Sequence, residues 1–220
     1  MNKFDGVIFD MDGLLFDTEM IYYDSSQKVA DEMGFPYTKE LYLQFLGVSD
    51  EEVWENYHRI YQDFGRETVD EFIRRSYADT ISMFESGQVQ LKEGVFELLD
   101  FLEESNIPKL VASSNVRPAI ELLLENAGIR DRFHRIVSAE DVSRAKPDPE
   151  IFQKAVSFLG THPEKTLVLE DSSHGVNAAY AAGIPVIMIP DLLQPDEDLK
   201  GKALQIFDSL LDVPNYLKNK

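Results

Sequence analysis

The sequence contains no cysteine, which excludes disulfide bonds, thiolate zinc sites and cysteine nucleophiles. It is also poor in basic residues, with 21 Lys and Arg against 40 Asp and Glu, so the net charge is −19. A chain this acidic should be repelled by nucleic acids and by anionic membrane surfaces, and we expect neither as a partner. The absence of cysteine fits a reducing compartment, so we expect a cytoplasmic protein.

Long apolar segments are missing too. The longest stretch without a formal charge covers residues 172–190, and polar residues, a glycine and a proline interrupt it. Aspartates break the apolar run near the amino terminus, and no basic region precedes a cleavage site of small residues. We therefore predict neither a membrane span nor a targeting segment.

Two glycine signatures of nucleotide binding are absent as well, Gly-x-Gly-x-x-Gly and the Walker-type glycine–lysine loop. The histidines, at positions 58, 134, 162 and 174, do not have the spacing of zinc ligands. His174 directly follows a serine, but a catalytic base meets its nucleophile through the fold and not through sequence adjacency. We interpret His174 as a residue at the start of a helix.

The chain of 220 residues does contain an alternation of short apolar runs and segments with helical spacing. The runs cover residues 7–10, 110–112, 135–137, 166–170 and 186–189, with a last one near 204–207. The helical segments cover residues 95–104, 118–127, 149–159 and 176–182. This alternation predicts an α/β fold with a Rossmann-like core built on a parallel sheet.

Residues 19–87 break the alternation, because they are polar, aromatic and helical in period, and they contain no predicted strand. The simplest interpretation is an all-helical cap domain inserted into the α/β core. We predict that residues 1–16 and 88–220 form the core and that residues 17–87 form the cap. The aromatic residues of the insertion favour a hydrophobic core more than a ligand site. Residues 191–202 are polar and rich in turn formers, which predicts a surface loop.

Acidic residues follow two of the predicted strands. Asp10 and Asp12 stand where the first apolar run meets a glycine turn, and Glu170 and Asp171 close the run at 166–170. The carboxyl ends of parallel strands meet at one edge of a sheet, where ligands bind. An isolated Asp-x-Asp is more often an ordinary turn, but two such pairs repel each other unless a cation lies among them. An all-oxygen ligand set of this kind suits Mg²⁺.

Candidate anion-binding residues follow the other apolar runs. Ser113, Ser114 and Asn115 come directly after the run at 110–112, where they either hold an anion or merely cap the next helix. Lys146 precedes a proline, and Asp148 is placed to cap the following helix, so the lysine stands at a rigid corner. Most lysines are solvated surface residues, but an ammonium fixed in this way is a common means of holding a phosphate.

These clusters, in this order, resemble the haloacid dehalogenase superfamily, and within it the phosphatases grouped with β-phosphoglucomutase. The segments that resemble its four motifs are Asp10–Gly13, Ser113, Lys146–Pro147 and Glu170–Asp171. Residues 14–18 also resemble the hinge into a helical cap, and Gly94 opens the return to the core. The resemblance therefore spans the chain.

The resemblance implies a phosphatase that acts on a small phosphorylated metabolite through an aspartyl phosphate. Asp10 is then the nucleophile, and Asp12 protonates the leaving alcohol and later takes a proton from water. The implied substrate-binding residues are Ser113, Ser114, Asn115 and Lys146. The implied Mg²⁺ ligands are the Asp10 carboxylate, the Asp12 backbone carbonyl and Asp171. Glu170 is either a further ligand or a residue that contacts one of the ligands.

Two departures from the superfamily's other patterns narrow the expected activity. The dehalogenases lack the second aspartate, so Asp12 favours phosphate-ester chemistry. The sugar-phosphate mutases usually carry a histidine on the first cap helix and an arginine after a Gly-Val-Ser segment. Here Tyr22 and Asp50 stand near those positions, and Asp50 should repel a second phosphate. Substrate selection would then come from the cap, with Tyr22, Tyr23, Arg74 and Arg75 as candidates.

Two alternatives stay open beside hydrolysis. One is a sugar-phosphate mutase of the β-phosphoglucomutase type. The other is a non-catalytic switch in which phosphorylated Asp10 is recognised by a partner, although Asp12 would shorten the life of that state. The sequence leaves open which ester is the substrate, whether Glu170 binds the metal directly, and the physiological role. It also leaves the oligomeric state open, with a monomer as the default expectation.

Overall fold

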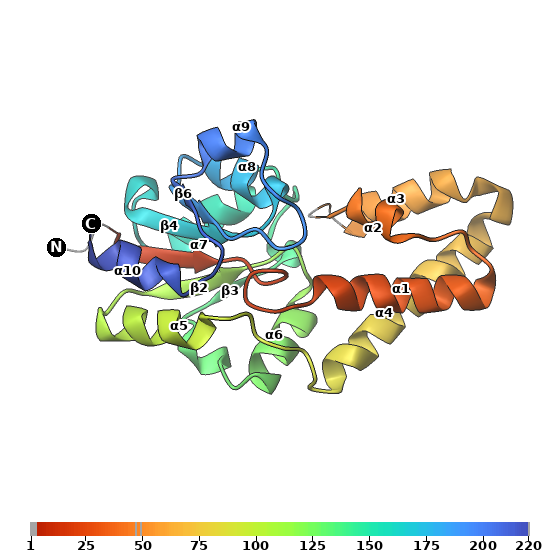
Figure 1. The fold of residues 1–220 in the computed structure, drawn as a ribbon, viewed down its shortest axis with the longest axis horizontal. Coiled ribbons are helices and arrows are strands. Elements are labelled where there is room, and N and C mark those ends of the chain that lie inside the picture. The colour runs from red at the N-terminus through yellow and green to blue at the C-terminus, as the bar shows by residue number, and fades with distance from the viewer. Residues whose placement is uncertain (1–3, 47, 49, 220) are drawn as a thin grey trace.

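The computed structural model describes residues 4–46, 48 and 50–219 and has a six-stranded parallel sheet at its centre (Figure 1). Its strands are β1 (Gly6–Phe9), β2 (Lys109–Ala112), β3 (Ile136–Val137), β4 (Thr166–Glu170), β5 (Val186–Met188) and β6 (Gln205–Ile206). They are ordered β3-β2-β1-β4-β5-β6, and every neighbouring pair is parallel. The predicted α/β fold with a Rossmann-like core is confirmed.

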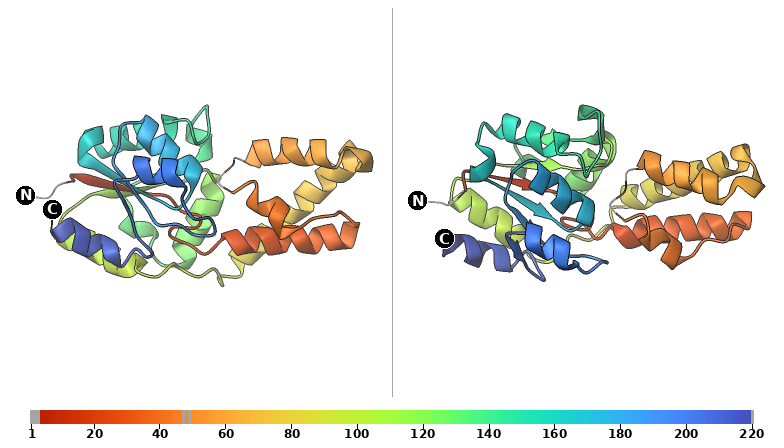
Figure 2. Two further views of the ribbon diagram at one scale, coloured as in Figure 1. Left: turned by 45° about the horizontal axis from the view of Figure 1, so that its top comes forward. Right: turned by 90° about the horizontal axis from the view of Figure 1, so that it is seen from above.

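Helices cover both faces of this sheet (Figures 1 and 2). One face carries α5 (Val95–Glu104), α6 (Arg117–Asn126) and α10 (Asp212–Lys218). The other carries α7 (Glu150–Leu159), α8 (Ser173–Ala181) and α9 (Glu197–Lys202). Side chains of β1 alternate between the faces, with Val7 and Phe9 in one hydrophobic core and Ile8 in the other. Short 3₁₀ turns, Gln62–Phe64, Arg130–Arg132, Ala139–Asp141 and Pro163–Lys165, complete the connections.

The prediction of a surface loop over residues 191–202 is wrong for its second half, which forms α9. The Asp196 side chain caps this helix by accepting a hydrogen bond from Leu199 N at 2.9 Å, and Leu199 is buried. A helix of six residues is too short to display a hydrophobic period, so its cap and one buried leucine determine it. The start of α10, which contains Pro214, was likewise not predicted from the spacing.

The inserted segment forms a separate group of helices beyond the carboxyl end of the sheet (Figure 1). They are α1 (Glu19–Met33), α2 (Lys39–Leu43), α3 (Asp50–Ile60) and α4 (Arg66–Glu85), and the described residues of 19–87 contain no strand. A core of aromatic and aliphatic side chains holds the helices together, with Phe35 stacked on Phe72 at 4.8 Å between ring centroids. The aromatic residues of this core thus serve packing, as the sequence predicts.

The chain enters and leaves this helical segment side by side. Phe16 and Leu91 form an antiparallel bridge, and Lys92 N donates a hydrogen bond to Leu15 O at 2.9 Å. We keep residues 17–87 as the proposed extent of the cap, because α1 begins and α4 ends just inside those limits.

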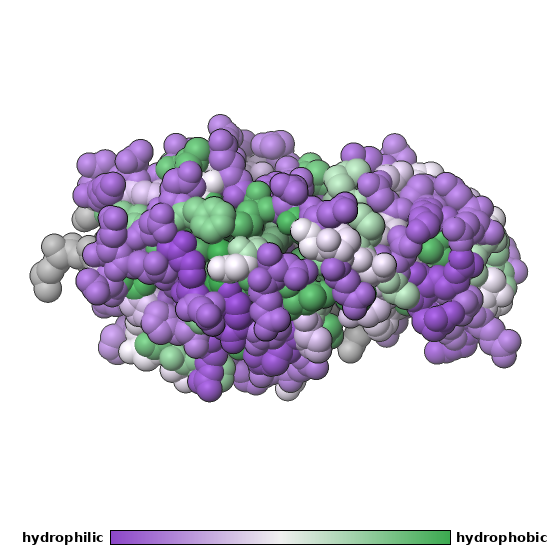
Figure 3. Space-filling model, turned by 90° about the horizontal axis from the view of Figure 1, so that it is seen from below, coloured by the Kyte–Doolittle hydropathy of each residue, from purple (hydrophilic) through white to green (hydrophobic). Residues whose placement is uncertain are grey.

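Hydrophilic side chains cover most of the face shown in Figure 3, in keeping with the net charge of −19. Apolar side chains on that face gather mainly over the sheet domain, whereas the cap is mostly hydrophilic with a few small apolar spots. None of the described helices combines the length and the apolar character that crossing a bilayer needs.

Candidate active site

An acidic cluster lies where the strand order reverses, between β1 and β4. Asp10 directly follows β1, Glu170 is the last residue of β4, and Asp171 comes next. Each offers a carboxylate oxygen, and these atoms lie within 4.8 Å of one another. The three residues are at most 9% exposed. The parallel pairing of β1 with β4 therefore brings together the acidic pairs that the sequence singled out.

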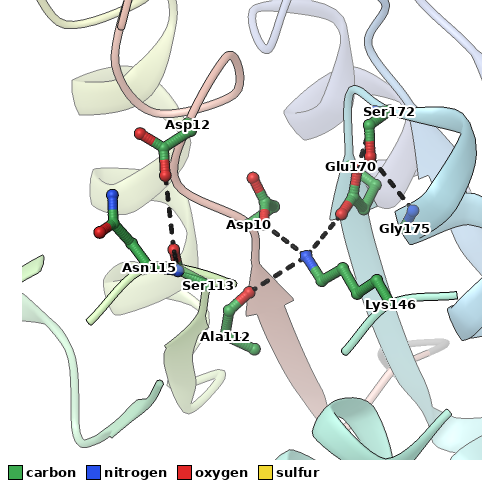
Figure 4. A network of polar contacts seen from close by, with 9 residues as sticks. All are labelled: Asp10, Asp12, Ala112, Ser113, Asn115, Lys146, Glu170, Ser172 and Gly175. Atoms are coloured by element: carbon green, nitrogen blue, oxygen red, sulfur yellow. Dashed lines mark hydrogen bonds and ion pairs between the residues drawn. The ribbon is translucent and has the colours of Figure 1, made fainter. Parts of the chain in front are cut away.

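Lys146 lies inside this cluster (Figure 4). Its Nζ is 2.5 Å from Asp10 Oδ1 and 2.7 Å from Glu170 Oε1, and it donates a longer hydrogen bond to Ala112 O at 3.4 Å. The alternative of a solvated surface lysine does not hold, since Lys146 is 6% exposed. The prediction that Asp148 is the N-cap is wrong, because α7 begins one residue later and its N-cap position is Pro149. Asp148 still accepts a hydrogen bond from Glu150 N at 3.0 Å.

The electrostatics of the cluster call for a further positive charge. Three carboxylates and one ammonium leave a net charge of about −2 in a buried site. Burial raises the pKa of Asp10, and the neighbouring Glu170 raises it against the lowering effect of Lys146. Burial raises the pKa of Asp171 as well, and Glu170 and Asp10 add to that shift. Burial would lower the pKa of Lys146, but the carboxylates beside it outweigh this effect and raise it.

A further carboxylate oxygen points to the same corner of the site. Asp191 Oδ2 is buried and has no hydrogen-bond partner within the described parts of the chain, while Lys92 Nζ lies 2.6 Å from Asp191 Oδ1. The turn at Gly13, with φ of +77°, lies against both Asp171 and Asp191. Oxygen donors without protons are the ligands of a hard divalent cation, so the residues present fit Mg²⁺.

Asp12 lines the same cavity as Asp10 but has different partners. Its Oδ1 accepts hydrogen bonds from Thr18 Oγ1 at 2.9 Å and from Tyr22 OH at 3.4 Å, and its Oδ2 accepts one from Ser113 Oγ at 3.4 Å. Burial raises the pKa of Asp12, although the hydrogen bond from Thr18 opposes the shift. A carboxyl group with a raised pKa is suited to donate a proton.

The segment after β2 places one serine inside and one outside the protein. Ser113 is fully buried, and its Oγ also accepts a hydrogen bond from Asn115 N at 3.0 Å. Ser114 is exposed and lines the cavity. Neither serine caps α6, whose N-cap position is Val116, so the capping interpretation is wrong.

Sequence reasoning missed the contact between Asn115 and the cap. Asn115 Nδ2 donates a hydrogen bond to Tyr22 OH at 2.6 Å, and Tyr22 in turn reaches Asp12. Tyr22 thus joins the first cap helix to the motif after β1 and to the segment after β2. Thr18 could have been noticed in the sequence, since it is the last residue of the hinge segment. Its hydrogen bond to Asp12, however, depends on the turn at Gly13.

The site opens into a cavity of about 180 Å³ between the core and the cap. Tyr22 lines it, whereas Tyr23, Arg74 and Arg75 do not. Arg74 pairs with Glu71, Arg75 pairs with Glu32, and Tyr23 stacks within the cap. Those three candidates for substrate selection are therefore not supported.

His174 is at the start of α8, as predicted, and does not line the cavity. Of the cap segment compared with the mutases, Gly47 and Ser49 lie outside the described residues.

Sequence and structure comparisons relate the chain to known proteins. A sequence model described as haloacid dehalogenase-like hydrolase matches residues 7–189. The phosphorylated carbohydrates phosphatase of Thermotoga maritima is 34% identical over 181 residues, which cover 82% of this chain and 82% of that protein. The validoxylamine A 7′-phosphate phosphatase of Streptomyces hygroscopicus subsp. limoneus is 31% identical over 180 residues, covering 81% and 82%. The crystal structure of β-phosphoglucomutase from Clostridium difficile has a TM-score of 0.82 at 23% identity, covers 98% of this chain and 96% of that chain, and shares the fold.

Proposed function

The chain belongs to the haloacid dehalogenase-like hydrolase family, and we propose that it is a Mg²⁺-dependent phosphatase of a small phosphate monoester. One observation carries the proposal. A buried carboxylate, Asp10, touches a buried ammonium, Lys146, at the end of a cavity, while a second carboxylate, Asp12, lies beside it with separate partners. This arrangement offers a nucleophile, a phosphate-binding cation and a proton donor to one substrate. The named phosphatases among the relatives support the same activity.

In the first step, an Asp10 carboxylate oxygen forms a bond to phosphorus as the bond from phosphorus to the leaving oxygen breaks. Asp12 gives its proton to that leaving oxygen, so that an alcohol departs. In the second step, water attacks the aspartyl phosphate and passes a proton to Asp12. The bond between phosphorus and Asp10 breaks, which releases inorganic phosphate and restores both carboxyl groups.

Lys146 and Ser113 are the proposed partners of the transferring phosphoryl oxygens. The ammonium is held by Asp10 and Glu170, so it needs no reorganisation when the substrate arrives. Ser113 is fixed by Asn115 N, and exposed Ser114 is placed at the cavity wall to contact the same group. Phosphoryl transfer depends chiefly on positioning and charge neutralisation, so these few groups suffice.

Mg²⁺ would be held by the carboxylates of Asp10 and Asp171 and by the Asp12 backbone carbonyl, where it neutralises charge on the phosphoryl group. Glu170 already accepts hydrogen bonds from Lys146 at 2.7 Å and from Ser172 N at 2.8 Å. We therefore propose that Glu170 positions Lys146 and does not ligate the metal directly.

Removal of divalent cations tests the proposal. Protein treated with a chelator should release phosphate from a panel of small monoesters at least about a hundredfold more slowly, because the charge on the phosphoryl group is no longer offset. Added Mg²⁺ should restore the rate, which is measured as inorganic phosphate. Asp171→Asn should raise the Mg²⁺ concentration needed for half-maximal rate. Equal rates with and without chelator would contradict a metal-dependent reaction.

Gly175→Ala should slow phosphate release about a hundredfold, because a Cβ at this position overlaps the Glu170 carboxylate. Glu170 cannot move aside freely, since its other oxygen accepts two hydrogen bonds from Ser172 (Figure 4). The displaced carboxylate would no longer hold Lys146. Gly201→Ala is the matched control, as Gly201 lies in α9 without positive φ and its Cβ would meet open space. That control should keep full activity and gain about 0.5–1 kcal/mol of unfolding free energy.

Hydrolysis is favoured over mutase activity, since a bisphosphate intermediate needs a second cationic site. Among the described residues that line the cavity, Lys146 is the only lysine or arginine, and the cap contributes Glu19 and Asp50. The proposal includes a cytoplasmic location, which rests on the cysteine-free sequence alone, and keeps a monomer as the default expectation.

A further inference from the structure

A buried hydroxyl group in the cap has no partner in the protein. Ser76 lies in the middle of α4, is 8% exposed and lines the cavity. Its Oγ makes no hydrogen bond to any residue that the structure describes. Serine within a helix often donates to the carbonyl one turn earlier, and Thr80 does so to Ser76 O at 3.1 Å, but Ser76 does not. Buried hydroxyl groups are nearly always satisfied, so this one points to a bound group.

Aromatic rings form the wall around this hydroxyl group. Tyr22, Tyr42 and Tyr57 line the cavity, and their own hydroxyl groups are engaged by Asn115, Glu19 and Tyr37 respectively. They therefore present ring carbon to the cavity. Trp54 and Tyr77 add two rings that are partly exposed at 37% and 36%. Such a wall favours a ligand with an apolar ring face over a flexible polar chain.

The ionisable cap residues that line the cavity are acidic. Asp50 and Glu19 line it, although burial raises the pKa of Glu19 to about 7, and no arginine or lysine of the described cap residues does. Lys146 is committed to Asp10 and Glu170 at the core end. An anionic group on the leaving alcohol would thus meet acidic side chains and find no cation among the described cap residues that line the cavity, which disfavours it.

Resting on the proposed phosphatase activity, we propose that the cap selects phosphate monoesters of small, uncharged, ring-bearing alcohols, and that Ser76 Oγ hydrogen-bonds a polar group on the ring. The cavity of about 180 Å³ is smaller than the roughly 300–1,000 Å³ of sites for drug-sized ligands, which fits a single metabolite. The phosphate occupies the end at Lys146, and the ring lies among the tyrosines. Ser76 acts on substrate selection and not on the chemistry of phosphoryl transfer.

Two matched pairs of esters test whether the cap disfavours a leaving alcohol that carries a negative charge. Glucuronic acid 1-phosphate carries a carboxylate in place of the hydroxymethyl group of glucose 1-phosphate, and orotidine 5′-monophosphate carries one more carboxylate than uridine 5′-monophosphate. We expect kcat/KM to be about a hundredfold higher for the uncharged member. Equal or reversed values would overturn the proposal, as would an enzyme that hydrolyses acetyl phosphate but none of the uncharged esters. Acetyl phosphate is too small to reach the cap, so failure on every compound, acetyl phosphate included, would instead reject the phosphatase activity.

Ser76→Ala tests the hydroxyl group itself. This variant should lose about tenfold in kcat/KM for the preferred ring ester and keep its rate on acetyl phosphate, because one neutral hydrogen bond to the ring is lost. Ser82→Ala, at an exposed position of the same helix, is the control and should change neither rate. Asp50→Asn should reduce the difference in kcat/KM between the two members of each pair of esters. Equal kcat/KM values for Ser76→Ala and Ser82→Ala on every ring ester would overturn the role of Ser76.

Discussion

Asp10→Asn should reduce phosphate release at least about 10⁴-fold, because a neutral amide cannot replace the carboxylate as nucleophile. The substitution keeps the size of the side chain and leaves an oxygen that can still accept a hydrogen bond from Lys146 Nζ, now 2.5 Å away. The fold should therefore be retained. Release of inorganic phosphate from acetyl phosphate and from the preferred ester, both with saturating Mg²⁺, measures the effect.

Asp5→Asn is the matched control for this prediction. Asp5 is exposed and directly precedes β1, whereas Asp10 directly follows it. Asp5 therefore lies at the end of the strand away from the cavity. It should keep the full rate, so any loss specific to Asp10→Asn comes from the site. A variant at Asp10 that keeps more than about a tenth of the rate would reject covalent catalysis by Asp10. A phosphorylated wild-type protein that forms but does not turn over would instead favour the phospho-aspartate switch.

The sheet and the acidic cluster could be predicted because they depend on local patterns. Parallel strands buried on both faces are almost wholly apolar, so β1 and β4 are visible as short apolar runs that end at an acidic residue. Asp10 and Glu170 directly follow or close such runs, and the rule that strand ends share an edge then brings them together. Lys146 was detectable because a proline and an aspartate directly follow it, just before a predicted helix.

The cap side of the site could not be predicted in the same way. Tyr22 and Asn115 are 93 positions apart, and nothing in the spacing around either residue signals the hydrogen bond between them. Ser76 is one of several serines in helical segments, and only the packing of α4 against the cavity leaves its hydroxyl group without a partner. Arg74 and Arg75, which the sequence analysis names as candidates, are held by nearby glutamates. The proposed substrate selection therefore depends on tertiary contacts, whereas the proposed catalytic residues follow from local sequence.

Lys146→Met should impair both activity and stability. Lys146 is buried between Asp10 and Glu170, and removal of its ammonium leaves two buried carboxylates without their counterion. Breaking a buried ion pair in this way costs about 3–5 kcal/mol of unfolding free energy. Loss of a fixed positive group on the transferring phosphoryl oxygens should also slow turnover by about 10²–10³-fold. Urea denaturation and phosphate release measure the two effects separately.

The dependence of this stability loss on Mg²⁺ connects the lysine to the metal site. If Lys146 and the cation offset the same carboxylates, added Mg²⁺ should narrow the difference in unfolding free energy between the variant and the wild type. Lys28→Met, which removes an exposed partner of Asp79 in the cap, is the control and should change neither stability nor its response to Mg²⁺. A Lys146→Met protein that unfolds more easily but retains full turnover would give the ammonium a structural role only. The phosphoryl group would then have to be neutralised by the metal and the backbone amides alone, since the described cavity lining contains no other lysine or arginine.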